Sequence, residues 1–351
     1  MNSELMRLLY SLMLFCVVLA SSAVASAQGR SDDPAVSVRM DVRFDGEAVT
    51  YGKYDFDGER PSADAGFVGR YLKLLADGKI NDKFSYSFRQ RMYTGHSDPK
   101  QFFSATDWAS VTYRPNSKFS VTAGKQMVCI GTIEYDYAPI DVYFASDFWN
   151  HVSPFQIGVN VGWSSSKNHT FYFQMVNSPF SKEAMESIFA YNVIWYGKLS
   201  PSFSTIYSVN MIEYEKGHFI NYIALGNKFK VGNGELDVDY MNRYAGKGTA
   251  FFEDFSLHGK LAYPVLDCVN LFAKGGYDVN RAQVADAPFI YDRYVLPGVE
   301  LGFYGAGVEY FPVKDAKQSL RLHAFWYSNT SDPVPNTFNV GVRWQMKLIE
   351  R

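Results

Sequence analysis

The sequence contains few cysteines, no excess of basic residues and, after its first 27 positions, no long apolar run. Three cysteines occur in 351 residues, and Cys129 and Cys268 are expected to lie at opposite ends of the fold, too far apart for a disulfide. The formal net charge of −2 argues against a nucleic-acid-binding surface. Paired cysteines for zinc and a glycine-rich phosphate loop are both missing. These absences predict no cofactor, no metal and no nucleic-acid partner.

The first 27 residues are typical of a signal peptide. Arg7 gives a positive start, residues 8–20 are apolar, and Ala25-Ser26-Ala27 supplies the small residues of a cleavage site. The apolar run is too short for a stable membrane-spanning helix, and no later stretch approaches the roughly 18 apolar residues that such a helix needs. We therefore expect export, followed by a single domain over residues 28–351.

The rest of the chain is rich in aromatic residues and alternates apolar with polar side chains. It holds 25 Tyr and 28 Phe. In residues 337–349, every second side chain from Phe338 to Leu348 is apolar and those between are polar or Gly. This period of two indicates a strand with one lipid face and one water face. About sixteen such segments follow one another, although an array of secreted β-sandwiches would share this composition.

The connections between these segments alternate in length. The short ones are 77–82, 115–117, 165–168, 200–202, 231–234, 264–268 and 312–318, and the long ones are 45–66, 95–103, 128–153, 178–187, 214–217, 246–251, 280–298 and 330–336. Short periplasmic turns opposite longer external loops are typical of outer-membrane barrels, which in bacteria have an even number of strands. The sequence therefore predicts an all-β fold, a transmembrane antiparallel β-barrel of about 16 strands.

The longest segment without strand alternation in the middle of the chain is 128–153. It carries four carboxylates and no Lys or Arg; the carboxylates are Glu134, Asp136, Asp141 and Asp147. A long insertion inside a regular fold is usually functional. We expect this third external loop to fold into the barrel and to narrow the pore.

Charged side chains on the polar faces of the strands are expected to face the lumen. The candidate pore-lining arginines are Arg39, Arg43, Arg89, Arg91, Arg321 and Arg343. Because the first and last strands should pair, these fall largely on one wall, which the loop carboxylates could face across the narrowest point. The alternative is that all these charges only solvate a wide interior. Glu235, Asp237 and Asp239 form an acidic opposite wall, where a divalent cation is a remote alternative to simple hydration.

Several short motifs resemble the phosphate-selective porin O and P family. They are FVGRYLKLL at 67–75, GKQ at 124–126, AKGGYDVN at 273–280, GVEYFP at 307–312 and SLRLHAFWY at 319–327. The resemblance implies a sixteen-stranded barrel, a homotrimer, a constricting third external loop and diffusion of small anions. Anion-selective members place lysines near the constriction, whereas the third loop here is acidic and has no basic residue.

These observations predict a porin of the bacterial outer membrane, bounded by membrane lipid, through which small hydrophilic solutes and ions diffuse passively. An anion-selective or phosphate-selective channel is the alternative. A barrel-fold hydrolase or a surface structural protein is more remote, because Gly95-His96-Ser97-Asp98 places catalytic residue types in sequence but a catalytic triad is defined by geometry. An enzyme is not expected.

Overall fold

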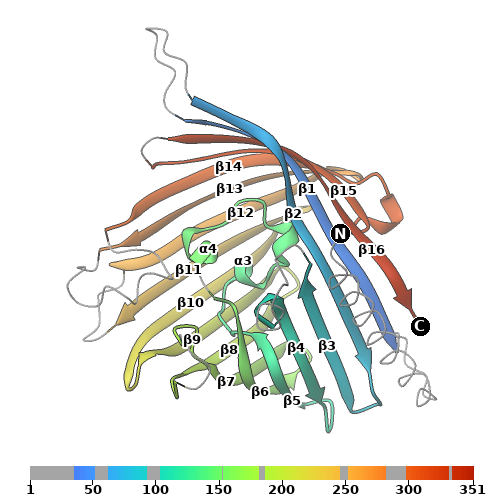
Figure 1. Cartoon of the computed structure of the whole chain (residues 1–351), viewed down its shortest axis with the longest axis vertical. Helices are drawn as coiled ribbons and strands as arrows, with labels where there is room; N and C mark the ends of the chain where they lie inside the picture. The colour runs from blue at the N-terminus through green and yellow to red at the C-terminus, as the bar shows by residue number, and fades with distance from the viewer. Residues whose placement is uncertain are drawn as a thin grey trace, which may run out of the picture.

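The computed structural model describes residues 35–51, 62–92, 103–151, 153–181, 186–245, 252–281, 298–331 and 334–351. The predicted signal peptide and residues 95–98 lie outside these ranges. The described residues form one closed sheet of sixteen antiparallel strands, in which β1 (Val36–Tyr51) pairs with both β2 (Ser62–Lys79) and β16 (Pro335–Glu350). Figure 1 shows the strands surrounding a lumen. The predicted antiparallel barrel is confirmed.

The remaining strands follow in chain order, each pairing with the next. They are β3 Phe84–Arg91, β4 Thr106–Tyr113, β5 Phe119–Met127, β6 Phe155–Ser166, β7 His169–Asn177, β8 Phe189–Ser200, β9 Phe203–Glu215, β10 His218–Val231, β11 Gly234–Ala245, β12 Asp254–Leu266, β13 Val269–Asn280, β14 Glu300–Tyr310 and β15 Leu320–Asn329. Closure leaves no open edge around the ring, so the backbone groups of the strands find partners within the sheet.

The two faces of the last strand have opposite chemistry, as the alternation predicts. Phe338 and Val340 are 54% and 66% exposed on the outside of the barrel. Asn339, which lies between these two residues, and Arg343, which follows them, are buried on the lumen side. This arrangement places apolar side chains against lipid and polar side chains toward water.

The ends of the barrel differ in the length of their connections. At one end β6 and β7, β8 and β9, and β10 and β11 are joined by two residues each. In the last of these turns Gly232 has a φ of +63°, a conformation that tight hairpin turns require and that glycine adopts easily. Val36 and Glu350 belong to this same end, because Ser37 pairs with Glu350. At the other end most connections are longer, but β9 and β10 are also joined by two residues, so the prediction of a long loop over 214–217 is wrong.

The first strand is longer than the sequence suggested. The expected strand ended at Phe44, because Asp45, Gly46 and Glu47 look like the start of a polar loop. In the structure β1 continues to Tyr51, with Asp45 opposite Gly341 of β16. Asp45 and Glu47 are polar because they face the lumen, where Asp45 binds Arg43. The prediction that residues 45–51 form a loop is therefore wrong.

The connection between β5 and β6 contains α3 (Ile133–Asp136), the 3-10 turn η1 (Pro139–Asp141) and α4 (Asp147–His151). Figure 1 shows α3 and α4 within the ring of strands. A further 3-10 turn, η4 (Lys314–Ala316), lies between β14 and β15. Cys129 begins the β5–β6 loop and Cys268 lies in the β12–β13 turn, and both are free thiols, as predicted.

None of the helices within the described ranges is both long enough and apolar enough to cross a membrane.

Candidate functional site

The β5–β6 loop is held at its first helix by a carboxylate of β11. Asp239 accepts hydrogen bonds from the backbone N–H groups of Ile133 (2.7 Å) and Glu134 (2.8 Å). Thr132 caps the same helix by accepting from the N–H of Tyr135 at 3.1 Å. The first backbone N–H groups of a helix have no partner within it, so these oxygens satisfy them.

Glu134 anchors the loop to β12 and β13. Its carboxylate pairs with the ammonium of Lys274 and lies 3.2 Å from Nε2 of His258, which is itself 3.0 Å from Asp239. Ser146, further along the loop, donates to the same carboxylate at 2.7 Å. Burial alone would raise the pKa of Glu134, but the charges of Lys274 and His258 outweigh it and lower the pKa to about 2. Glu134 is therefore ionised at neutral pH.

A row of arginines on three neighbouring strands holds the middle of the loop. Arg343 of β16 lies opposite Arg43 of β1 and Arg321 of β15 in the sheet register. Asp141 is 3.1 Å from both Arg321 and Arg343, and Arg43 donates to the carbonyl of Val142 at 3.2 Å. This row binds the loop directly, so much of its hydrogen-bonding capacity is used inside the protein.

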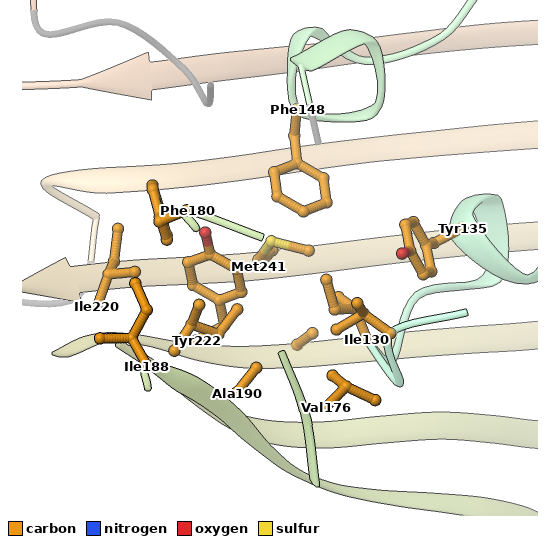
Figure 2. Packing of buried hydrophobic residues seen from close by; sticks show 13 residues of the cluster. Ile130, Tyr135, Phe148, Val176, Phe180, Ile188, Ala190, Ile220, Tyr222 and Met241 are labelled. Atoms are coloured by element: carbon orange, nitrogen blue, oxygen red, sulfur yellow. The ribbon is translucent and has the colours of Figure 1, made fainter. Parts of the chain in front are cut away.

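Apolar packing fixes the loop against β7 to β11. Figure 2 shows Phe148 of α4 and Ile130 and Tyr135 of the loop directed toward lumen side chains that include Tyr222 and Met241. Tyr222 is fully buried and makes an edge-to-face contact with Phe148 at 5.9 Å between ring centroids. The loop thus covers this wall of the barrel and leaves space along the wall that β1 to β5 form.

Three neighbouring cavities lie beside the loop. The central cavity, about 730 Å³, lies between β1–β5 and the loop. It shares Tyr71, Pro139, Trp149 and Asn150 with a cavity of about 410 Å³ toward the long-loop end of the barrel. It shares Asp136 and Tyr137 with a third cavity of about 350 Å³, which lies between the loop and β7–β10 near the short turns. The shared lining residues place the three cavities next to one another around the loop.

Three cations of the central cavity converge on one buried carboxylate. Asp107 of β4, whose side chain is 1% exposed, lies 2.9 Å from Lys73, 2.7 Å from Arg89 and 3.0 Å from Arg91. The guanidinium of Arg89 also stacks on the ring of Trp108, 3.6 Å from its centroid. This cluster therefore carries three positive charges and one negative charge.

The comparisons with known proteins fit this geometry. The family model of the phosphate-selective porins O and P matches residues 42–202, which run from β1 to the turn after β8 and include the whole β5–β6 loop. The match spans 161 of the 351 residues, so over somewhat less than half of its length the chain is similar to this family, and with the barrel fold this identifies it as a porin. Family and fold together describe an outer-membrane channel for passive diffusion rather than an enzyme.

Solved structures share the fold at low sequence identity. The channel DcaP of Acinetobacter baumannii is 11% identical over 92% of this chain and all of its own, with a TM-score of 0.61. OmpT of Vibrio cholerae is 12% identical, covering 91% of this chain and 99% of its own, with a TM-score of 0.57. A mutant of the Rh. blastica porin is 14% identical, covering 89% of this chain and 100% of its own, with a TM-score of 0.55. No curated protein matches the chain.

The six arginines expected to line the pore divide into two groups in this porin. Arg39, Arg89 and Arg91 line the central cavity. Arg321 and Arg343 bind the loop through Asp141. Arg43 also binds the loop, and it borders the cavity at the long-loop end.

The four loop carboxylates lie in different directions. Asp141 contacts the arginine row, whereas Glu134 lies against β13 and Asp136 accepts from Tyr196 of β8 at 3.0 Å. Asp147 borders the cavity at the long-loop end, and its backbone N–H donates to Asp278 at 2.9 Å. The carboxylates of the acidic wall on β11 also have partners within the protein. Asp239 caps α3, and Asp237 lies 3.3 Å from Lys228.

Lys73, Asp107 and Lys274 were not among the expected site residues. Lys274 occupies a lumen-facing position of β13, so the period of two could have identified it. Asp107 precedes the lumen-facing Trp108 at a bulge of β4 opposite Arg89 and Gln90, so the period of two would have placed it on the outer face. Their roles depend on the pairing of distant strands, which the local pattern does not specify.

Asp136 is expected to make the ion selectivity of this porin depend on pH. Part of its carboxyl is open to the lumen, yet enclosure by the barrel raises its pKa above the ordinary value, although the Tyr196 hydroxyl opposes the shift. The folded protein therefore binds this proton at a higher pH than the unfolded chain does, and gains stability from it as pH falls. Loss of the charge should raise anion permeability relative to cation permeability as pH falls from 7 toward 4.

Reversal potentials of the wild type and Asp136→Asn, measured across this pH range, test that expectation. The variant should already show the higher anion permeability at pH 7 and should lack this titration step. Identical pH curves for the two proteins would rule out Asp136 as the titrating group.

Proposed function

We propose that the three cavities are the permeation path of this porin and that the loop over residues 128–153 is its constriction. The observation that carries the proposal is the series of three neighbouring cavities around the loop, each of which shares lining residues with the central one. Loop contacts with β1, β11, β13, β15 and β16 support it, because a loop held on several sides can define a fixed opening. Small hydrophilic solutes and ions would then diffuse along this path without an energy source.

The lining favours anions weakly. Four cations line the central cavity, Arg39, Lys73, Arg89 and Arg91, against the three carboxylates Asp41, Asp107 and Asp136, so the difference is one positive charge. Charged side chains along a pore set its selectivity. A modest preference for anions is therefore the function that this geometry supports best.

A phosphate-selective channel is the second candidate, on account of the cluster of Lys73, Arg89 and Arg91. Asp107 weakens this candidate, because it already accepts from these cations and would repel a phosphate dianion placed between them. We therefore place general diffusion with anion preference ahead of phosphate selectivity.

The porin is further proposed to be exported by a signal peptide at residues 1–27, to form a domain over 28–351 and to assemble as a homotrimer. A structure titled the trimer form of Vibrio cholerae OmpT, 12% identical with a TM-score of 0.59, supports the last point only as a precedent in this fold.

A planar bilayer holding the purified porin under a KCl gradient tests the proposed function. We expect steady conductance and a reversal potential whose sign shows that chloride permeates more readily than potassium. Added phosphate should change the conductance little. Block by low concentrations of phosphate would favour the second candidate. The complete lack of conductance by a folded barrel would contradict both.

A further inference from the structure

The central cavity combines cations with aromatic side chains. The strands supply its cations, and the loop supplies the aromatic side chains Tyr135, Tyr137 and Trp149, beside Tyr71, Trp108 and Phe155 of the strands. Trp149 is half-buried and makes an edge contact with the buried Tyr135 at 5.8 Å between ring centroids. Its indole is therefore held in place while part of it faces the cavity.

Two of the four cations are partly exposed to the cavity, although Arg91 also donates to the backbone carbonyl of Ser104 at 2.7 Å. The side chains of Arg39 and Arg91 are 41% and 31% exposed, whereas Lys73 and Arg89 are almost fully buried. Arg39 approaches Asp41 through Nε at 3.5 Å, and neither of its Nη atoms has a hydrogen-bond partner in the described part of the chain. Two guanidinium N–H groups side by side suit the two oxygens of a carboxylate.

The entrance to this cavity from the long-loop end passes aromatic rings from the strands and from the loop. Tyr71 of β2 and Trp149 of α4 line the central cavity and the cavity at the long-loop end alike. A solute that moves from one cavity to the other therefore passes these two rings before it reaches Arg39. Aromatic faces favour flat aromatic partners beyond the area that they bury, by about 0.5–1.5 kcal/mol per pair.

We propose that the central cavity is a binding subsite for aromatic monocarboxylates. The ring lies against Trp149 and Tyr71, and the carboxylate lies on Arg39 and Arg91. Inorganic phosphate fits less well, because it has no apolar body for the aromatic rings and Asp107 opposes a second negative charge. A neutral sugar could pack on the aromatic rings, but it has no charge to pair with the guanidinium groups. The proposal rests on the proposed function, since it requires the central cavity to be part of the permeation path.

Single-channel recording with matched carboxylates tests the proposal. Benzoate and cyclohexanecarboxylate have the same charge and number of ring carbons, but only benzoate is aromatic and flat. We expect benzoate to block the chloride current at about five-fold lower concentration than cyclohexanecarboxylate. Phosphate and a neutral maltose probe should block less than benzoate does.

Variants of this porin separate the aromatic and the cationic parts of the subsite. Trp149→Leu should make benzoate and cyclohexanecarboxylate block at similar concentrations. Trp149→Phe should keep most of the difference between their blocking concentrations. Arg39→Gln should weaken block by both carboxylates to a similar extent. Trp163→Leu, which changes an exposed indole on the outside of the barrel, is the matched control and should have no effect.

The outcomes distinguish this proposal from the proposed function. Equal block by the two carboxylates in the wild type, or stronger block by maltose or phosphate, overturns the aromatic-carboxylate subsite while the conductance still supports the channel. An unchanged preference in folded Trp149→Leu also overturns it. If that variant does not fold, the wild-type comparison of the two carboxylates decides. A wild type without conductance removes both proposals.

Discussion

Replacing Glu134 with Gln is expected to release the loop and to give larger, noisier single-channel currents. The carboxylate pairs with Lys274 and His258 in a buried cluster. Glutamine leaves Lys274 without its counter-charge, whereas His258 keeps Asp239. Removing one partner of a buried ion pair typically costs about 3–5 kcal/mol. Because this free energy holds the loop against β12 and β13, open states with a wider path should become populated.

Glu235→Gln is the matched control for this prediction. Glu235 lies 3.3 Å from Lys228, but its side chain is 49% exposed, and surface pairs of this kind contribute about 0–1 kcal/mol. Its current should equal that of the wild type. If Glu134→Gln also conducts with wild-type amplitude and noise, Glu134 does not hold the constriction.

The contribution of Glu134 is also expected to depend on pH. Its pKa is about 2 in the folded protein, below the ordinary glutamate value of 4.5, so it stabilises the folded state above pH 4.5. That stabilisation is lost as pH falls from 4.5 toward 2. The difference in thermal stability between wild type and Glu134→Gln should therefore be constant from pH 7 to 5 and should shrink below that. A difference that grows on acidification would contradict this assignment.

The barrel could be predicted from sequence because its determinants are local. Alternation in β16 shows directly which side chains face lipid, and the two-residue turns separate strands clearly. The alternation in β10 does not by itself show which face meets lipid, since both of its faces are partly apolar. The structure gives the reason: Ile220, Tyr222 and Ala224 face the lumen but are covered by the loop, so an apolar lumen face is stable there.

The contacts of the loop could not be predicted in the same way. Glu134 and Lys274 are 140 positions apart, and Asp239 and Ile133 are 106 apart. Their meeting depends on how far the loop reaches across the lumen and on the register of several intervening strands. Four acidic residues without a basic residue indicated that the loop needs cationic partners, but that composition fits Arg321, Lys274 or solvent equally well. Side-chain charge alone did not select among them.

Replacing Asp107 with Asn is expected to make the porin clearly more selective for anions. Asp107 supplies the one negative charge among Lys73, Arg89 and Arg91, so its neutralisation changes the charge of the cluster from +2 to +3. A unit charge about 6 Å from an ion in water changes its energy by about 0.7 kcal/mol, or about three-fold in relative permeability. Asparagine keeps the shape of the side chain and can still accept a hydrogen bond.

The reversal potential under a KCl gradient measures this effect, and salt provides an internal check. The shift between wild type and Asp107→Asn should be larger at about 0.1 M than at about 1 M salt, because the screening length falls from about 10 Å to 3 Å. Asp82→Asn, in the exposed β2–β3 turn, should leave the reversal potential unchanged. An unaltered permeability ratio in folded Asp107→Asn would mean that ions do not pass this wall, and it would remove the central cavity from the permeation path.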